Sequence, residues 1–153
     1  MGESNGVKVY IIGSLRNPQV PLLGNFLRGH GWEVFEDWYA AGPEADDKWM
    51  AYEQGRGHTF AEALKGHAAQ HVFQFDKHHL DTSDIVVLMM PAGKSGHLEF
   101  GYAIGQGKKG FILLEQEPER FDVMYAFATG VVYDWEELQM AISHAAFDIE
   151  VRR

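Results

Sequence analysis

The sequence contains no cysteine among its 153 residues. Disulfide bonds, thiolate catalysis and cysteine-ligated zinc sites are therefore excluded. The N-terminal stretch MGESNGVKVY also lacks the basic and then apolar pattern of a secretory signal. We therefore expect a cytoplasmic protein.

Basic residues are also scarce. The chain has 13 Lys and Arg against 22 Asp and Glu, a formal net charge of −9 with the 8 histidines counted neutral. Sequence-independent binding of a nucleic acid polymer needs a basic surface, and Lys108-Lys109 is the only basic pair before Arg152-Arg153. No apolar run approaches the roughly 20 residues of a membrane-spanning helix. A small-molecule partner fits better than a polymer or a membrane.

What the chain does have is enough apolar sequence for one folded domain, with 46% hydrophobic residues. Short β-branched runs alternate along it with helical patterns. The expected strands are 7–12, 33–35, 85–90, 111–114 and 131–133, and the expected helices are 18–28, 59–80, 98–107, 118–128 and 134–146. This alternation predicts an α/β fold, Rossmann-like or flavodoxin-like, with a mostly parallel five-stranded sheet and helices on both faces.

The segment 36–58 does not fit this alternation. It holds Trp38, Tyr39, Trp49 and Tyr52 among many acidic residues, without a clean periodicity. Connections this long are usually functional or disordered, and the aromatic content argues against disorder. We predict a lid or pocket wall, with a helical turn near 46–52, inserted in a single domain that spans 1–153.

In a parallel α/β sheet, ligands bind beyond the carboxyl ends of the strands. Residues 13–17 (GSLRN) follow the first expected strand. The guanidinium of Arg16 offers forked donors to a phosphate, and the hydroxyls of Ser14 and Ser95 can donate to the same group. A solvated loop arginine is the alternative interpretation. The dinucleotide pattern G-x-G-x-x-G is absent, and we expect no cofactor.

Residues 91–99 follow the strongest expected strand. Gly93 and Gly96 permit a tight turn close to a ligand, and the amides at the start of the next helix favour an anion. Glu99 is expected in the first turn of that helix. A carboxylate there complements the helix dipole, so its position alone supports a structural role and a catalytic role about equally.

The stretch SGHLEFGYAIGQGKKGFILL resembles the signature of the nucleoside 2-deoxyribosyltransferase superfamily, which includes nucleoside 5'-monophosphate N-glycosidases. The resemblance extends over about residues 7–138. It implies that Glu99, which precedes Gly-Tyr-Ala, is the nucleophile and that Tyr10 orients it. It also implies a site role for Asp76, which stands eight positions before Asp84. GSLR resembles the phosphate-binding loop of the nucleotide hydrolases.

The transferases carry a further aspartate shortly before the glutamate, proposed to handle the leaving base. Here Gly93-Lys94-Ser95 occupies that stretch. Cleavage of the bond to the base builds positive charge on the sugar, which a carboxylate can stabilise or bond. We predict that Glu99 attacks the sugar and that Asp76 protonates the departing base, with Asp37 and His97 as rival acids.

Several further residues are candidates for the pocket. Trp38 could stack on the base and hydrogen-bond to it, or pack on the core instead. In the family, the region equivalent to 121–127 (FDVMYAF) reaches a neighbouring subunit's active site. The resemblance therefore implies a homo-oligomer, dimer or higher, with shared active sites. The expected substrate-binding residues are Gly13, Ser14, Arg16, Asn17, Trp38, Gly93, Ser95, His97, Met124 and Tyr125.

A metal site is not expected. His67 and His71 are four positions apart, on one face of an expected helix. No Glu follows His67 directly, so the zincin pattern is absent.

Together these features predict an enzyme that cleaves the N-glycosidic bond of a nucleoside or nucleoside 5'-monophosphate, as a hydrolase or a deoxyribosyl transferase. GSLR favours the 5'-phosphate and hydrolysis. Two alternatives stay open. The first is a glycohydrolase of NAD or a related nucleotide, which only the aromatic segment 36–58 supports. The second is a non-catalytic nucleotide-binding sensor, against which the retained Tyr10, Asp76 and Glu99 argue.

Overall fold

The computed structural model describes residues 6–153. Its centre is one five-stranded sheet with the order β2-β1-β3-β4-β5, and every pair of neighbouring strands is parallel. The strands are β1 (Lys8–Ile12), β2 (Glu33–Phe35), β3 (Ile85–Met89), β4 (Lys109–Leu113) and β5 (Gly130–Val132). This is the flavodoxin-like strand order, and it confirms the predicted fold class.

The central strand, β3, is the fully apolar run of the sequence. All of its residues are buried, because it lies between β1 and β4 and is covered on both faces. Val87 pairs with Ile11 on one side and with Phe111 on the other.

Two helices cover one face of the sheet: α1 (Gln19–Gly29) and α6 (Trp135–Val151). Leu23 of α1 and Ile142 of α6 are fully buried in the same cluster as Val87. The side chain of Asp134 caps α6 by accepting a hydrogen bond from the amide of Glu137 at 2.7 Å. The predicted cap is therefore present, and the helix runs further than expected, to Val151.

The other face is covered by α5 (Lys94–Gly105), whose Phe100 and Ala103 pack with Tyr10 and Ile12 of β1. The prediction that this helix begins at residue 98 was wrong. It begins at Lys94, so Glu99 lies in the second turn, and the first turn holds no acidic residue. A role for Glu99 as a first-turn partner of the helix dipole is thereby removed.

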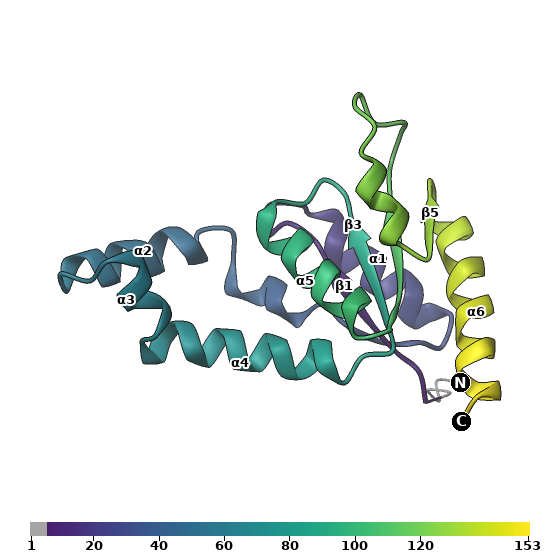
Figure 1. Ribbon diagram of the computed structural model, residues 1–153, viewed down its shortest axis with the longest axis horizontal. Coiled ribbons are helices and arrows are strands. Elements are labelled where there is room, and N and C mark those ends of the chain that lie inside the picture. The colour runs from purple at the N-terminus through teal and green to yellow at the C-terminus, as the bar shows by residue number, and fades with distance from the viewer. Residues whose placement is uncertain (1–5) are drawn as a thin grey trace.

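A helical arm leaves the sheet between β2 and β3 and extends away from it (Figure 1). It consists of the 3-10 helix η1 (Asp37–Ala41) and the helices α2 (Ala45–Gly55), α3 (Phe60–Leu64) and α4 (His67–Asp81). The predicted turn near 46–52 is a complete helix. The single helix predicted over 59–80 was wrong, because Gly66 adopts an extended conformation (φ −76, ψ 166) and separates α3 from α4.

Most large apolar side chains of α2 to α4 do not join the core. Phe60 is 70% exposed, Phe73 54% and Phe75 49%. Leu80 alone among the residues of α4 is buried. The apolar face that the helical pattern predicts therefore exists, but within residues 6–153 no other element covers most of it.

The connection between β4 and β5 also differs from the prediction. In place of a helix over 118–128 there is only the short 3-10 helix η2 (Val123–Phe127). This connection between β4 and β5 projects beyond the sheet, at the top of Figure 1. The side chain of Asp122 accepts from the amide of Met124 at 2.9 Å, which sets a turn before η2.

Within residues 6–153, no helix combines the length and the apolar character that a bilayer crossing requires. The prediction of a missing secretory signal rests partly on residues 1–5, which lie outside the described residues.

Candidate active site

Tyr10 and Glu99 meet between β1 and α5. Tyr10 is fully buried, and its hydroxyl donates a 2.9 Å hydrogen bond to Oε2 of Glu99. Side chains alternate along a strand, so β1 directs Tyr10 and Ile12 toward α5 while Val9 and Ile11 join the opposite cluster. The glutamate is held by a rigid strand residue.

Asp76 of α4 is the third member of this group. Its charge contributes to raising the pKa of both Tyr10 and Glu99. The structure thus brings together three residues from β1, α4 and α5 that lie far apart in the sequence. Asp37, a rival for the acid, instead influences the pKa of Lys8 and Glu36.

Burial dominates the electrostatics of this group. It raises the pKa of Glu99 to about 7, against the lowering effect of the Tyr10 hydrogen bond and with a further increase from Asp76. Burial also raises the pKa of Asp76 to about 6. The pKa of Tyr10 rises above its ordinary value, first from burial and then from Glu99. A proton can therefore be held or released by either carboxyl group near neutral pH.

Asp76 and Glu99 both lack an ion-pair partner within the described part of the chain. Two partly buried carboxyl groups without a cation favour a positive charge placed between them. Such a charge develops on a sugar as its bond to a base breaks.

This chain shares its architecture with known structures, although no protein-family model and no curated protein sequence matches it. A 2-deoxyribosyltransferase from the psychrotolerant bacterium Bacillus psychrosaccharolyticus superposes with a TM-score of 0.58 at 16% identity, over 87% of this chain and 90% of that chain. The chain has the fold of a 2-deoxyribosyltransferase. This finding confirms the fold that the sequence resemblance implied.

Two further solved structures match. A conserved protein from Enterococcus faecalis V583 has a TM-score of 0.59 at 13% identity, over 90% of this chain and 98% of that chain. The CMP N-glycosidase BcmB from Clostridium botulinum has a TM-score of 0.47 at 16% identity, over 89% and 98%.

The loop after β1, residues 13–17, is the expected phosphate loop. The side chains of Ser14 and Asn17 hydrogen-bond to nearby backbone amides. Ser14 Oγ accepts from the amide of Arg16 at 3.1 Å, and Asn17 Oδ1 accepts from the amide of Gln19 at 2.9 Å. The guanidinium of Arg16 is exposed and lies 3.8 Å from Asp47 of α2. This surface contact is weak, so an anionic ligand can replace it.

His97 and Tyr125 connect α5 to η2. His97 Nδ1 lies 2.8 Å from the carbonyl oxygen of Gly93, and Nε2 lies 2.8 Å from the Tyr125 hydroxyl. Because a carbonyl only accepts, Nδ1 carries the proton. In the neutral ring, Nε2 then accepts from Tyr125. The neighbouring Met124 is 60% exposed, and Ser95 is exposed in the first turn of α5.

Trp38 is partly buried and packs against both core clusters. Its indole N–H donates to the carbonyl oxygen of Ile11 at 2.8 Å. A contact between Trp38 and a base would therefore use the ring face, since the N–H group is already bonded.

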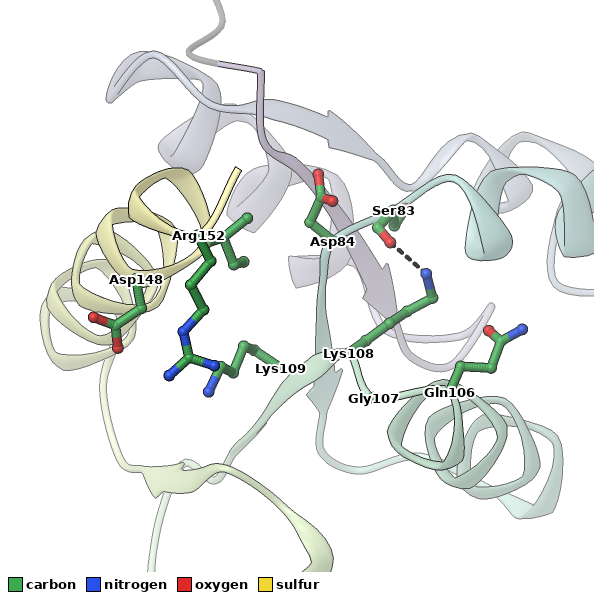
Figure 2. A pocket seen from close by; sticks show the side chains of 9 residues that line it. Ser83, Asp84, Gln106, Gly107, Lys108, Lys109, Asp148 and Arg152 are labelled. Carbon is green, nitrogen blue, oxygen red and sulfur yellow. Dashed lines mark hydrogen bonds between the residues drawn. The ribbon is translucent and has the colours of Figure 1, made fainter.

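Two hollows of about 290 Å³ each lie elsewhere on the molecule. One is at the amino ends of β3 and β4, where Lys108 Nζ donates to the carbonyl oxygen of Ser83 at 2.6 Å (Figure 2). The other lies beyond the carboxyl ends of β3 and β4, beside Tyr133 and Trp135. Neither of these two hollows is lined by Tyr10, Asp76 or Glu99.

Within residues 6–153, no group of three or more His, Asp or Glu side chains converges as a metal site would require. His67 and His71 are both exposed, at the N-terminal end of α4.

Proposed function

We propose that the protein cleaves the N-glycosidic bond of a nucleoside or nucleoside 5'-monophosphate, with Glu99 as the nucleophile. The observation that carries the proposal is the pair of partly buried carboxyl groups, Glu99 and Asp76. Neither is in an ion pair within residues 6–153, and buried Tyr10 holds Glu99. The fold shared with a 2-deoxyribosyltransferase supports the same activity.

The steps follow from the position of each group. Tyr10 directs Oε2 of Glu99, and ionised Glu99 attacks the anomeric carbon. A bond forms between that carbon and the carboxylate oxygen while the bond to the base breaks. Asp76 supplies the proton that the leaving base takes up. Water then hydrolyses the glycosyl ester, with Asp76 accepting its proton, or a second base takes the sugar.

A 5'-phosphate is the substrate feature that the loop 13–17 supports. Arg16 can leave its weak contact with Asp47 for a phosphate with forked geometry. Ser14 and Gly13 stand in the same loop at the carboxyl end of β1, where ligands of such sheets bind. This favours a nucleoside monophosphate and hydrolysis over transfer between free nucleosides.

We further propose that a second copy of the chain covers the arm and completes the site. Several large apolar side chains on α2 to α4 are at least 44% exposed: Met50, Tyr52, Phe60, Leu64, Val72, Phe73 and Phe75. Beside the carboxyl pair, Leu98 is 75% exposed. Exposed apolar surface on this scale marks an interaction site.

Sedimentation velocity tests the assembly. We expect a dimer or larger homo-oligomer, and we expect Phe73→Glu to dissociate it and to lower activity. A fully active wild-type monomer would contradict shared active sites.

Base release, followed by chromatography, tests the chemistry. Purine and pyrimidine nucleosides, their 5'-monophosphates and NAD are each incubated with wild-type or Glu99→Ala protein, with and without an acceptor base. We expect free base from a monophosphate with the wild type only. Release from NAD alone would favour the glycohydrolase alternative. Ligand-induced thermal stabilisation without release from any compound would favour the sensor.

A further inference from the structure

The ring and hydrogen-bond contacts of helix α4 with the sheet and with α5 lie in its C-terminal half, from Phe75 onward. Leu80 is its one buried residue. The N-terminal part of the helix extends away from the sheet, toward α3 (Figure 1). Asp76 lies only one turn before Leu80. The contacts that hold this last part of α4 therefore determine where the carboxyl group of Asp76 is placed.

Two anchors hold the end of α4. On the side of the sheet, the ring of His79 stacks on Phe35 with centroids 4.0 Å apart, and Lys8 Nζ lies 2.9 Å from His79 Nδ1. On the side of α5, the hydroxyl of Tyr102 donates to Asp81 Oδ1 at 2.7 Å. This side-chain hydrogen bond joins α4 directly to α5.

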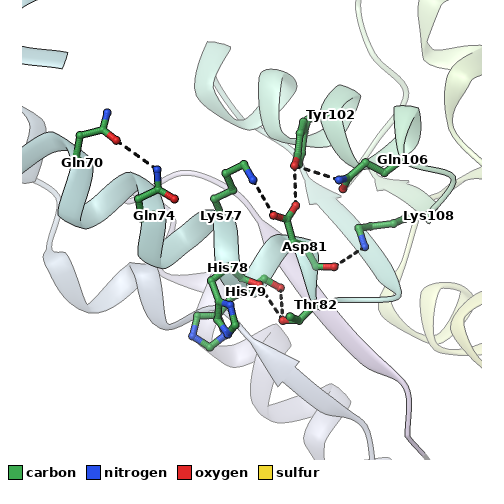
Figure 3. A network of polar contacts seen from close by, with 10 residues as sticks. All are labelled: Gln70, Gln74, Lys77, His78, His79, Asp81, Thr82, Tyr102, Gln106 and Lys108. Atoms are coloured by element: carbon green, nitrogen blue, oxygen red, sulfur yellow. Dashed lines mark hydrogen bonds and ion pairs between the residues drawn. The ribbon is translucent and has the colours of Figure 1, made fainter. Parts of the chain in front are cut away.

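The hydrogen bond between Tyr102 and Asp81 is part of a network of polar side chains (Figure 3). Lys77 Nζ donates to Asp81 Oδ2 at 2.8 Å and lies 5.7 Å from the centre of the Tyr102 ring. Lys108 Nζ donates to the carbonyl oxygen of Asp81 at 2.9 Å, and Gln106 Nε2 donates to the Tyr102 hydroxyl at 3.0 Å. Asp81 thus accepts bonds at both carboxylate oxygens and at its backbone oxygen, which fixes it from three directions.

This network lies close in sequence to each carboxyl group of the site. Tyr102 follows Glu99 by one turn of α5, and residues one turn apart share a helix face. Lys77 is the neighbour of Asp76 in α4. A shift of the Tyr102–Asp81 contact therefore changes the separation of Asp76 and Glu99.

We propose that Tyr102 is a positioning residue for the reaction, whose hydrogen bond to Asp81 holds Asp76 at a fixed separation from Glu99. The inference rests on the proposed N-glycosidase function. Tyr102 does not touch the carboxyl pair and acts on it through α4.

The two carboxylates repel each other when both are ionised. Without the Tyr102 hydroxyl, the remaining contacts at the end of α4 oppose that repulsion less strongly, and α4 can shift outward. These contacts are buried Leu80, the His79 ring and the bond from Lys108 to the Asp81 carbonyl oxygen. A displacement of about 1 Å at a reacting group can cost about 100-fold in rate. Asp76 would then deliver its proton poorly, and its charge would raise the pKa of Glu99 less.

The test is Tyr102→Phe, which removes the hydroxyl and keeps the ring. We expect kcat for base release to fall about 10-fold or more, with KM changed less than about 2-fold. By carbon-detected NMR titration of the carboxyl group, we expect the pKa of Glu99 to fall below about 7, by the part of its elevation that comes from Asp76, while burial keeps it above the ordinary value. In the free protein, the groups facing Glu99 are Tyr10 and Asp76, so this shift reports the distance to α4.

Gln74→Ala is the matched control, because Gln74 lies on the same helix and donates only to Gln70 at 3.3 Å (Figure 3). It should leave kcat and the pKa of Glu99 unchanged, and thermal unfolding checks that both variants fold. An unchanged pKa of Glu99 in Tyr102→Phe would overturn the inference, whether or not kcat falls. The titration needs no substrate. If the wild-type protein releases no base, the proposed function is contradicted. The pKa of Glu99 in Tyr102→Phe still decides whether Tyr102 positions α4.

Discussion

The hydroxyl of Tyr10 on β1 donates to Oε2 of Glu99 on α5 at 2.9 Å, with Tyr10 fully buried. This bond favours the ionised form of Glu99 and opposes the effect of burial on its pKa. It therefore does two things that a carboxylate nucleophile needs: it fixes one oxygen, and it increases the fraction of Glu99 that is ionised near neutral pH.

Tyr10→Phe should shift the pH dependence of the reaction. Loss of the hydrogen bond raises the pKa of Glu99 further above about 7, so less of the nucleophile is ionised. We expect kcat/KM at pH 6 to fall about 10- to 100-fold, with partial recovery at pH 8. Tyr133→Phe, which removes a hydroxyl that donates to Glu117 at 2.6 Å, is the control. A Tyr10→Phe profile that falls equally at both pH values would argue against this role.

Glu99→Gln should stabilise the protein at high pH. The folded state raises the pKa of Glu99 from 4.5 to about 7, so this group's contribution to stability is complete below pH 4.5 and is lost as the pH rises through about 7. Glutamine stays neutral and avoids that loss. We expect a gain of about 1–3 kcal/mol in the free energy of unfolding at pH 8 and none at pH 4.

Urea unfolding of both proteins at the two pH values measures the difference. A gain of the same size at pH 4 and pH 8 would mean that the ionisation of Glu99 is not its source.

Asp76→Asn should impair base departure. The amide cannot supply the proton, so we expect kcat to fall about 10²- to 10⁴-fold, most for bases that leave poorly without protonation. The pKa of Glu99 should also fall, because the charge of Asp76 contributes to raising it.

Asp37→Asn separates the rival carboxylates. Asp37 lies in η1 and influences Lys8 and Glu36, so its loss should leave base release nearly unchanged. A large loss of activity in Asp37→Asn with little loss in Asp76→Asn would reverse the assignment of the acid.

Arg16→Ala should weaken the binding of the substrate's 5'-phosphate and leave the rest of the reaction unchanged. Because a hydrogen bond to a charged group contributes about 1.5–3 kcal/mol, we expect KM for a nucleoside 5'-monophosphate to rise about 10- to 100-fold, with activity on the free nucleoside unchanged. Arg56→Ala, which removes a contact with Tyr52 on the arm, is the matched control. Equal effects on nucleoside and monophosphate would exclude a phosphate site at Arg16.

The sheet could be predicted because its signals are local. An uninterrupted apolar run such as 85–89 indicates a strand that is covered on both faces, and burial along β3 is complete. The start of α5 was missed because its N-cap, Gly93, offers no capping side chain. The predicted helix over 118–128 failed because residues 118–122 are irregular and Asp122, whose side chain accepts from the amide of Met124, begins only a short 3-10 helix.

The arm shows the limit of hydrophobic periodicity. The pattern finds the apolar face of residues 59–80, but it does not say what covers that face or that Gly66 divides the helix. Contacts between distant segments are also invisible in the sequence. Asp47 beside Arg16 and the bond from Tyr102 to Asp81 are examples. Glu99, Tyr10 and Asp76 could be grouped only through a family resemblance, and the structure places them together.

The central claim is that Glu99 bonds covalently to the sugar. Mass spectrometry of the protein after rapid acid quenching with a nucleoside 5'-monophosphate tests it most directly. The account predicts a glycosyl phosphate adduct on the peptide that contains Glu99, formed before steady state in the wild type and absent from Glu99→Gln. Release of base by the wild type without any adduct, together with an active Glu99→Gln variant, would contradict it.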